Sequence, residues 1–386
     1  MKRKSFGKTG VELSILGFGC MRLPLSDPKN QAAIDRDLAV EMIRKGIDGG
    51  INYIDTAWPY HGNSRVEPGE SEPLVGQALA GGFREKVFLA TKLPTWFMEN
   101  QKQMNEILDR QLTRLKTDHI DFYLAHNLNN QVWPAIKDKG LLKFLDEALK
   151  DGRIKHAGFS FHDDYELFAD IIESYSWSFC QIQYNYLDVE YQAGKRGLQL
   201  AVDKGLGAVI MEPLRGGFLI NHMPEEMKKM LAEIRPEWSL ADWALRWLWS
   251  QPEAGPVLSG MSAMDQLEEN LKIADSAESL NDRETAALEQ VRAFFKERLK
   301  VNCTGCGYCL PCPEGVNIPK NFLFYNDYFL VDSEEVRERN MLLFNNLVNP
   351  SETCGNCVHC RQCEEKCPQN LPISDLMDDV ARVFGV

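Results

Sequence analysis

Four polar side chains in the first third of the sequence are of types that can together carry out proton transfer. Asp55 ends the apolar run at residues 51–54, and Tyr60 follows it five positions later. Lys92 and His126 end two later apolar runs, in the segments ATKLP and LAHN. Hydride reduction of a carbonyl leaves an alkoxide that must be protonated. A phenol can supply this proton if its pKa, about 10, is brought closer to neutral.

Each of the four residues has an expected role in such a reaction. We expect Lys92 to lie beside Tyr60 and favour its phenolate, while Asp55 holds the ammonium charged and oriented. We expect His126 to hydrogen-bond the substrate oxygen and fix its approach to the hydride. Taken singly, Asp55 can cap a strand end, Lys92 can be solvated, and His126 can be a hydrogen-bonded core histidine. Their joint occurrence at successive strand ends favours catalysis.

The segments that must position these residues alternate between strand-like and helix-like patterns. After a hairpin over residues 5–13, apolar runs predict strands at residues 13–19, 53–55, 87–92, 120–126, 154–159, 180–184, 207–211 and 256–258. Apolar residues at three-to-four spacing predict helices at residues 38–49, 104–115, 141–150, 165–174, 197–204, 240–249 and 264–274.

This alternation predicts a closed (β/α)8 TIM barrel, with an open doubly wound sheet as the alternative. The glycine-rich phosphate loop of the open sheet is missing, because Arg22 stands where a third glycine would follow Gly17 and Gly19. We therefore favour the barrel. Its chemistry is expected at the carboxyl ends of the strands, where Asp55, Lys92 and His126 fall.

Composition limits the class of protein and its partners. With 386 residues, 44% of them apolar, the chain can form a large core and more than one folding unit. A net charge of -13 argues against nucleic acid and anionic membrane surfaces, and favours a small-molecule or protein partner. The apolar segment after the basic N-terminus is interrupted by Ser14 and two glycines and lacks a cleavage-site pattern. We therefore expect a soluble, cytoplasmic protein.

The cysteines mark a second domain. Nine of the eleven lie between Cys303 and Cys367, and we place the boundary between a barrel at residues 1–282 and a second domain at residues 283–386. Close-set cysteines in a cytosolic protein indicate metal ligation rather than disulfides. One motif is C-x2-C-x2-C-x2-C before Pro313, and the other is C-x2-C-x2-C-x3-C before Pro368. Two zinc sites are the alternative to iron-sulfur clusters, which runs of this kind ending in Cys-Pro favour.

The second motif is the bacterial ferredoxin pattern, and this region resembles a two-cluster ferredoxin with a helical insertion of about forty residues between the motifs. In such proteins the fourth cysteine of each motif binds the other cluster. The resemblance thus implies Cys303, Cys306, Cys309 and Cys367 for one [4Fe-4S] cluster, and Cys312, Cys357, Cys360 and Cys363 for the other. Cys354 is a spare ligand or a free thiol.

From Phe6 to about Ala274 the sequence resembles the aldo/keto reductases. The resemblance rests on IDTAxxY at Asp55 and Tyr60, TK at Lys92, YLAH at His126 and the late segment GMSAMDQLEEN. It implies a nicotinamide-dependent carbonyl reductase that prefers NADPH, with NADH as the alternative. The cofactor positions that it implies are Met21, Ser160, Gln183, Met211, Leu214, Arg215, Gly216, Gly260, Ser262, Gln266, Glu269 and Asn270.

The sequence departs from the family pattern at three places. Phe161 stands where an asparagine usually follows the serine, and Gln266 replaces an arginine that many members use against the 2'-phosphate. The insertion NSRVEP lengthens the loop that holds Tyr60 and is expected to shape the substrate mouth.

Three functional hypotheses follow. The first is an NADPH-dependent enzyme that reduces an aldehyde or ketone and carries structural or docking clusters. The second hypothesis takes account of the electron count, since a hydride carries two electrons and each cluster passes one. It is an electron-transfer protein that exchanges electrons with a ferredoxin or flavoprotein. The third is a nucleotide-sensing module on the same scaffold.

Overall fold

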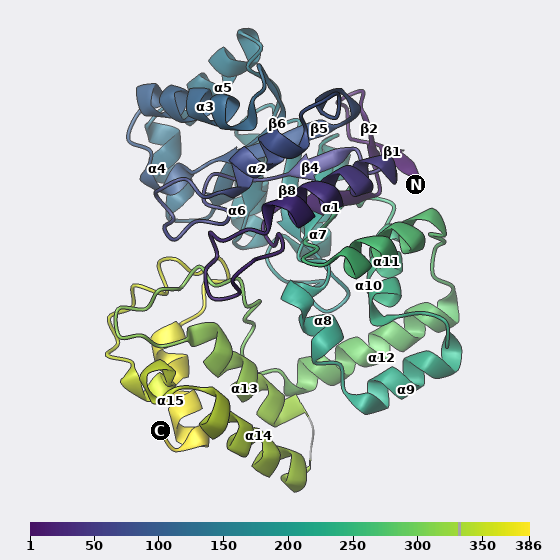
Figure 1. Ribbon diagram of the computed structural model, residues 1–386, viewed down its shortest axis with the longest axis vertical. Coiled ribbons are helices and arrows are strands. Elements are labelled where there is room, and N and C mark those ends of the chain that lie inside the picture. Colours follow the sequence, from purple (N-terminus) through teal and green to yellow (C-terminus); the bar gives the residue numbers. More distant parts are fainter. Residues whose placement is uncertain (331–332) are drawn as a thin grey trace. The chain divides into compact units, whose positions relative to one another are not determined.

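Eight parallel strands close into a barrel in the order β10-β3-β4-β5-β6-β7-β8-β9 in the computed structural model, which describes residues 1–330 and 333–386 (Figure 1). The strands are β3 (Leu16–Gly19), β4 (Tyr53–Asp55), β5 (Phe88–Leu93), β6 (Ile120–Leu128), β7 (Ile154–Phe161), β8 (Phe179–Gln183), β9 (Gly207–Met211) and β10 (Val257–Ser259). The predicted barrel is confirmed, and each predicted strand overlaps an observed one. Strands of this kind are buried on both faces, which explains their continuous apolar runs.

Helices connect successive strands on the outside of the barrel. They are α1 (Arg36–Asp48), α2 (Ser71–Ala78), α3 (Gln101–Leu115), α4 (Val132–Asp138), α5 (Leu141–Lys150), α6 (Tyr165–Glu173), α7 (Gly194–Asp203), α10 (Leu240–Trp249) and α11 (Met264–Asp275). Side chains of Asp35, Asn100 and Asp164 accept hydrogen bonds from the first turns of α1, α3 and α6. These caps fix where the helices begin. The seven predicted helices are confirmed, whereas α2 and α4 were not predicted.

The predicted N-terminal hairpin is confirmed and closes the amino-terminal end of the barrel. It consists of β1 (Arg3–Ser5) and β2 (Glu12–Ser14). Phe6, at its turn, packs edge-on against Phe122 with ring centroids 5.4 Å apart. A Cβ at Gly207, the first residue of β9, would meet this ring at 2.5 Å, so only glycine fits there. The opposite, carboxyl-terminal end of the strands is therefore left for chemistry.

Packing divides the chain into two compact units. The first comprises residues 1–213 and 245–279, and the second comprises residues 214–244 and 280–386. The boundary that we place at residue 282 from the sequence lies close to the third and last crossing between the units, at residues 279 and 280. Residues 214–244 include η3 (Arg215–Gly217), α8 (Phe218–Asn221) and α9 (Glu225–Ile234).

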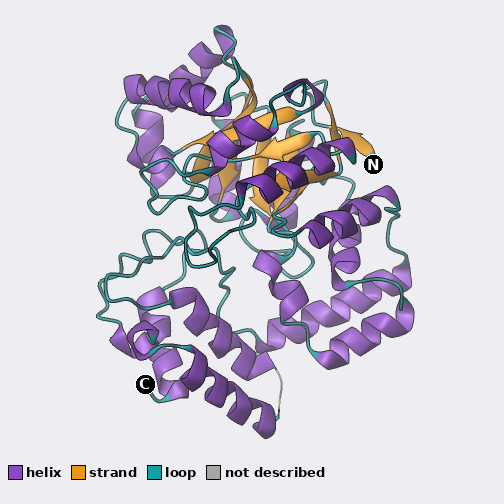
Figure 2. Cartoon of the chain, in the orientation of Figure 1, coloured by secondary structure: helices purple, strands orange, loops and turns teal. Residues whose placement is uncertain are grey.

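The second unit is mainly helical (Figure 2). Besides α8 and α9 it contains α12 (Asp282–Arg298), α13 (Ile318–Leu330), α14 (Glu334–Leu347) and α15 (Ile373–Phe384), with short turns η4 (Pro350–Glu352) and η5 (Cys354–Asn356). Its core includes Phe322 and the rings of Phe344 and Phe384, which stack with centroids 4.0 Å apart. The predicted helical character of this region is confirmed.

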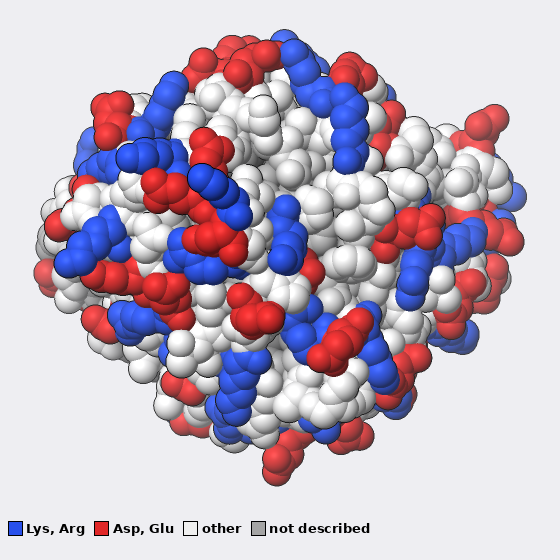
Figure 3. Space-filling model, turned by 90° about the horizontal axis from the view of Figure 1, so that it is seen from above, with Lys and Arg blue, Asp and Glu red and all other residues white. Residues whose placement is uncertain are grey.

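Acidic and basic side chains are interspersed on the face shown in Figure 3. Across residues 1–330 and 333–386, every helix is too short or too polar to cross a membrane.

Candidate active site

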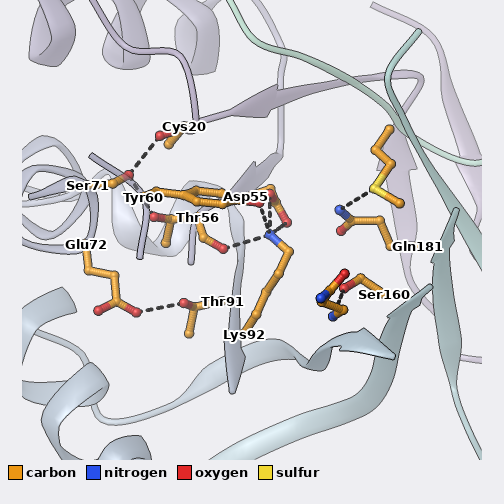
Figure 4. Close-up of polar contacts among 12 residues, drawn as sticks. Cys20, Asp55, Thr56, Tyr60, Ser71, Glu72, Thr91, Lys92, Ser160 and Gln181 are labelled. Atoms are coloured by element: carbon orange, nitrogen blue, oxygen red, sulfur yellow. Dashed lines mark hydrogen bonds and ion pairs between the residues drawn. The ribbon is translucent and has the colours of Figure 1, made fainter. Parts of the chain in front are cut away.

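A buried ion pair lies at the carboxyl ends of two neighbouring barrel strands. Lys92 Nζ, on β5, donates to the two carboxylate oxygens of Asp55, at the end of β4, at 2.6 and 2.8 Å (Figure 4). It also donates to the carbonyl of Thr56 at 2.9 Å. Both charged side chains are almost fully buried. The short distances and the additional bond to Thr56 satisfy the ammonium, as a buried charge requires.

Tyr60 lies directly against this pair, as predicted. Its hydroxyl is 3.3 Å from Lys92 Nζ, and the ammonium lies 4.8 Å from the centre of its ring. Our expectation that Lys92 would lower the pKa of Tyr60 is wrong for the structure described here. Burial raises this pKa well above its usual value, and the negative charge of Asp55 raises it further. The main physical reason is the burial of the phenol, and Asp55 adds to it because its charge offsets that of Lys92 at close range.

His126 approaches the same point from β6. Its ring lies 6.0 Å from that of Tyr60, in an edge-to-face arrangement. Burial lowers the pKa of His126 well below its ordinary value, and the positive charges of Lys92 and Arg65 lower it further. Within the described part of the chain, the buried Nδ1 atom has no hydrogen-bond partner. A neutral imidazole with an unused nitrogen is suited to bind a polar atom of a ligand.

A second layer of buried polar groups holds Lys92 in place. Gln111, on α3, donates to the backbone carbonyl of Lys92 at 3.0 Å and to Glu72 at 2.7 Å. Thr91, the neighbour of Lys92, also donates to Glu72 at 2.8 Å (Figure 4). Arg114 donates to the second carboxylate oxygen of Glu72 at 2.9 Å. Sequence inspection missed these residues because their partners come from α2 and α3, far away along the chain.

Three of the expected cofactor-binding residues lie on the adjacent strands β7, β8 and β9. Ser160 Oγ, on β7, accepts a hydrogen bond from the backbone N–H of Asn127 at 2.7 Å. Gln183, at the end of β8, is fully buried and donates to Asp188 at 2.8 Å. Met211, the last residue of β9, is half-buried, and its sulfur accepts from the amide of Gln181 at 3.5 Å.

Gln181 was not selected from the sequence. It is 3% exposed, and in the described chain its Oε1 atom is buried without a hydrogen-bond partner. Figure 4 places Gln181 and Ser160 across from the Lys92–Asp55 pair. An orphaned buried amide oxygen that faces the site is costly unless a ligand satisfies it. The alternation of β8 is the signal that could have identified it, because Gln181 and Gln183 share one face of the strand.

The remaining cofactor candidates fall into three groups. Met21 is half-buried and follows β3, and its neighbour Cys20 donates from its backbone to Asp55 O at 2.8 Å. Gly260 and Ser262 lie between β10 and α11, and Gln266, Glu269 and Asn270 lie on α11. Gln266 accepts a hydrogen bond from the backbone N–H of Ser262 at 2.9 Å, and Asn270 donates to Ser259 at 3.0 Å. Leu214, Arg215 and Gly216 belong to the second unit, where Arg215 and Gly216 adopt positive φ angles in η3.

The second unit contains a cavity lined by four of the predicted cluster ligands. Its walls include Cys303, Cys306, Cys309 and Cys367, together with apolar side chains such as Phe322 and Ile373. Burial raises the pKa of Cys309, and the neighbouring sulfurs of Cys306, Cys303 and Cys367 raise it further. The structure therefore brings together the set implied by the ferredoxin resemblance for the first cluster.

The second set gathers around Cys357. Burial raises the pKa of the Cys357 thiol, and the sulfurs of Cys312 and Cys360 raise it further. Burial likewise raises the pKa of Cys363 to about 11, with smaller contributions from Cys357 and Cys312. Cys312 thus lies close to Cys357 and Cys363 of the second motif. Cys354 is buried and its backbone N–H donates to Asn321 at 2.9 Å.

Helix α13 fixes the two cysteine segments through two buried asparagines. Asn326 Oδ1 accepts from the backbone N–H groups of Lys300 and Val301 at 3.1 and 2.9 Å, and its Nδ2 donates to the Val301 carbonyl at 2.7 Å. These contacts hold the chain just before Cys303. Asn321 donates to the Glu352 carbonyl at 2.8 Å, and so holds the chain before the second motif.

Four cysteines line one cavity in the second unit. This arrangement fits a group that takes one thiolate at each corner, as a [4Fe-4S] cluster does.

Comparisons with known proteins agree with both halves of this description. A model of the aldo/keto reductase family matches residues 15–293, and a model of a 4Fe-4S dicluster domain matches residues 302–371. The chain belongs to the aldo/keto reductase family. It is an NAD(P)H-dependent oxidoreductase that carries an iron-sulfur domain.

Individual relatives cover the barrel. An uncharacterized oxidoreductase, YqkF, of Bacillus subtilis is 27% identical over 324 residues, covering 75% of this chain and 96% of its own length. The NADH-specific methylglyoxal reductase of Escherichia coli is 26% identical over 350 residues, covering 75% of this chain and all of its own. A solved structure of aldo-keto reductase AKR11C1 from Bacillus halodurans, in its holo form, superposes with a TM-score of 0.63 at 25% identity, covering 75% of this chain and 96% of its own.

Proposed function

We propose that this protein reduces an aldehyde or ketone to an alcohol with NADPH, and that Tyr60 is the general acid. The observation that supports this most directly is the convergence of Tyr60, Lys92, Asp55 and His126 at one end of the barrel. A site of this kind needs one proton donor, a charge that stabilises the donor after it has lost its proton, and a polar contact for the substrate oxygen.

The environment of each group fits its proposed role. The raised pKa of Tyr60 keeps the phenol protonated, so the proton is present when the alkoxide forms. Lys92 then stabilises the phenolate left behind, and Asp55 keeps the ammonium in place between turnovers. The low pKa of His126 keeps its imidazole neutral, so it orients the carbonyl oxygen and leaves proton donation to Tyr60.

The cofactor supplies the hydride when bound. Ser160, Gln183 and Met211 are the proposed contacts of the nicotinamide, and we add Gln181 because of its orphaned amide oxygen. Leu214, Arg215 and Gly216 are proposed for the pyrophosphate, with Met21, Gly260, Ser262, Gln266, Glu269 and Asn270 completing the set. We propose NADPH over NADH, although the Escherichia coli relative is named as NADH-specific.

We propose one [4Fe-4S] cluster on Cys303, Cys306, Cys309 and Cys367, and one on Cys312, Cys357, Cys360 and Cys363. Their proposed role in the reductase is structural, or to dock a partner. The exposure of Cys360 supports a second candidate function, in which the outer cluster exchanges electrons with a ferredoxin or flavoprotein. Clusters and free cysteines suit a reducing compartment, and we propose the cytoplasm.

The test is anaerobic consumption of NADPH and of NADH against a panel of aldehydes and ketones. Tyr60→Phe should lower turnover by about 100- to 10,000-fold, the usual contribution of a general acid, while cofactor binding changes little. Tyr53→Phe is the matched control. It removes a buried hydroxyl that has no hydrogen-bond partner in the described chain, and should leave turnover near that of the wild type. Loss of cofactor binding in Tyr60→Phe would contradict the assigned role.

A cluster-ligand variant separates the two candidate functions. If the protein is a carbonyl reductase, Cys360→Ser should retain hydride transfer to aldehydes, because no step of the proton chemistry uses the cluster. If it is an electron-transfer protein, the same variant should lose reduction of one-electron acceptors, and carbonyl reduction should be absent from both proteins.

A further inference from the structure

Strand β6 contains one extra residue near its carboxyl end. Ala125 pairs with Phe159 of β7. The next pair is Leu128 with Phe161, so three steps along β6, from 125 to 128, match two steps along β7, from 159 to 161. Asn127 lies in this bulge and adopts a φ of 60°, in the left-handed region. A bulge at the rim of a barrel redirects side chains, and an unusual φ beside an active site points to a functional role.

The backbone of Asn127 is fixed beside Ser160. Its N–H donates to Ser160 Oγ at 2.7 Å. Ser160 is in turn the sheet partner of Gln181 on β8. The three residues therefore form a row across β6, β7 and β8. Figure 4 shows Ser160 and Gln181 facing the Lys92–Asp55 pair.

Two buried amide oxygens in this row lack a partner. Asn127 is 6% exposed, and Gln181 is 3% exposed. Within residues 1–330 and 333–386, neither Asn127 Oδ1 nor Gln181 Oε1 has a hydrogen-bond partner. A buried acceptor without a partner is costly, so two of them in one row point to a ligand that donates hydrogen bonds there.

The backbone conformation alone does not account for Asn127. Asparagine tolerates a positive φ better than most residues, because its short side chain can hydrogen-bond the nearby backbone. In the described chain, however, Oδ1 of Asn127 makes no such bond. Glycine would adopt the same φ without burying an amide. The amide oxygen therefore calls for a partner other than the turn itself.

The residue after Ser160 does not contribute to this row. Phe161 is fully buried and packs against Phe168 of α6, outside the barrel, with ring centroids 5.1 Å apart. Because successive side chains of a strand point to opposite faces, Ser160 faces the inside of the barrel. The asparagine that usually follows the serine is thus missing from β7, and β6 brings Asn127 to the same row.

The row matches the hydrogen-bonding groups of a primary carboxamide, which has two N–H donors and one carbonyl acceptor. Asn127 Oδ1 and Gln181 Oε1 can each accept one N–H. Ser160 Oγ already accepts from the backbone of Asn127, so its hydroxyl hydrogen is left to donate to the carbonyl. The nicotinamide ring carries such a carboxamide.

We propose that Asn127 is a further cofactor-binding residue, whose side-chain oxygen accepts a hydrogen bond from the carboxamide of the nicotinamide. This inference rests on the proposed use of a nicotinamide cofactor and adds a residue to that site. With Ser160 and Gln181, Asn127 holds the carboxamide and so fixes the rotation of the ring. The hydride and the proton from Tyr60 are those of the proposed reaction.

The experiment measures calorimetric binding of NADP⁺ and of its 3-acetylpyridine analogue to the intact protein under anaerobic conditions. The analogue has a methyl group in place of the carboxamide nitrogen, so it keeps the carbonyl and loses the N–H donors. The main variant is Asn127→Gly, because glycine adopts the positive φ without strain. The control is Lys116→Gly, which makes the same change at an exposed residue with a φ of 54° at the end of α3.

Asn127→Gly should weaken binding of NADP⁺ by about 3- to 10-fold, the loss expected for one neutral hydrogen bond, and binding of the analogue by less than about twofold. Lys116→Gly should match the wild type with both ligands. Asn127→Asp keeps an acceptor oxygen in place and should retain the preference for NADP⁺ over the analogue. If Asn127→Gly weakened both ligands equally, or neither, Asn127 would only shape the strand end and the inference would be overturned.

The same measurement separates this inference from the proposed function. If the protein binds NADP⁺ but reduces no aldehyde or ketone, the proposed function fails, and the comparison of the two ligands still tests Asn127. If the protein binds NAD⁺ more tightly, NAD⁺ and its 3-acetylpyridine analogue take their place. A wild type that binds neither NADP⁺ nor NAD⁺ would overturn the inference together with the proposed function.

Discussion

Lys92 Nζ lies 2.6 and 2.8 Å from the two carboxylate oxygens of Asp55 but 3.3 Å from the hydroxyl of Tyr60. The ammonium of Lys92 therefore binds Asp55 more closely than it binds Tyr60. Burial is the main cause of the raised pKa of Tyr60, and the negative charge of Asp55 adds to it although a cation lies beside the phenol. The unequal sharing of the ammonium makes Asp55 the residue that sets how strongly Lys92 acts on Tyr60.

Asp55→Asn should change both stability and pH dependence. It leaves a buried ammonium without its counter-charge, which typically costs roughly 3–5 kcal/mol of unfolding free energy. It also removes a negative charge that raises the pKa of Tyr60, so the alkaline limb of kcat/KM should move to lower pH. Denaturant unfolding and a pH profile of the reaction measure the two effects.

The control is Asp48→Asn, which removes the partner of Lys86 at 3.1 Å. Both side chains of that pair are at least half exposed, so the change should cost less than about 1 kcal/mol. An alkaline limb that stays in place in Asp55→Asn would contradict the proposed coupling.

His162 should make the fold sensitive to acid. Burial lowers its pKa from the ordinary 6.5 to about 4 in the folded protein. Between these values the unfolded chain binds the proton and the folded chain does not, so the free energy of unfolding falls as pH falls through this window. The contribution, lost progressively between about pH 6.5 and 4, is at most roughly 3 kcal/mol at 1.36 kcal/mol per pKa unit.

The measurement is unfolding of the wild type and His162→Asn at several pH values under anaerobic conditions. The difference between the two curves removes effects common to both proteins, including those of the clusters. It should shrink as pH is lowered from 7 toward 4. A constant difference would show that His162 does not titrate in this window.

The interleaved cluster assignment predicts a non-additive pattern. Cys303→Ser and Cys367→Ser should each lower iron and sulfide content by about half, and the double variant should lose no more, because the two residues serve one cluster. The double variant Cys303→Ser with Cys312→Ser should lose nearly all of its iron and sulfide, because these residues serve different clusters. Chemical analysis of anaerobically purified protein measures this. Cys354→Ser is the control and should retain both clusters. If the double variant of Cys303 and Cys367 lost twice as much iron and sulfide as either single variant, the pairing would be refuted.

Asn326→Ala should speed cluster loss. It removes three hydrogen bonds that hold residues 300 and 301 before Cys303, leaving buried backbone groups unpaired at a cost of about 1–3 kcal/mol. The rate of bleaching by a chelator should therefore rise. Asn340→Ala is the control on α14, since in the described chain its buried Oδ1 has no hydrogen-bond partner. Equal rates in the two variants would count against a role for Asn326.

Much of the fold was predictable because the barrel strands are short apolar runs that end in polar residues. Asp55 and Lys92 were found in this way. Helix α2 was missed because it buries Ser71 and Glu72 toward the protein, so its apolar pattern is broken. Glu72 is tolerated there because Thr91, Gln111 and Arg114 bind it, and those partners lie on other elements. Helix α4 was missed because it contains Pro134, and a proline in a sequence favours a loop.

The candidate site was only partly predictable. Residue types and spacing identified Tyr60, Lys92 and the two cysteine motifs, and the resemblance to two-cluster ferredoxins implied how the cysteines divide into two sets. The direction of the pKa shift at Tyr60 was wrong because spacing reveals neither how deeply the phenol is buried nor that Asp55 binds the ammonium more closely. Gln181 and Asn127 were missed because their place in the site depends on which residues lie beside one another on neighbouring strands. A single sequence does not contain that information.

The meeting of Cys367 with Cys303, Cys306 and Cys309 at one cavity also orders events during synthesis. The first three sulfurs leave the ribosome well before the fourth, and at roughly 5 to 20 residues per second the delay amounts to several seconds. The barrel strands, all earlier in the chain, can pair during that time. Cluster insertion is therefore expected as a late maturation step. Cells starved of iron should accumulate a chain whose barrel is folded and whose last hundred residues are open to proteases.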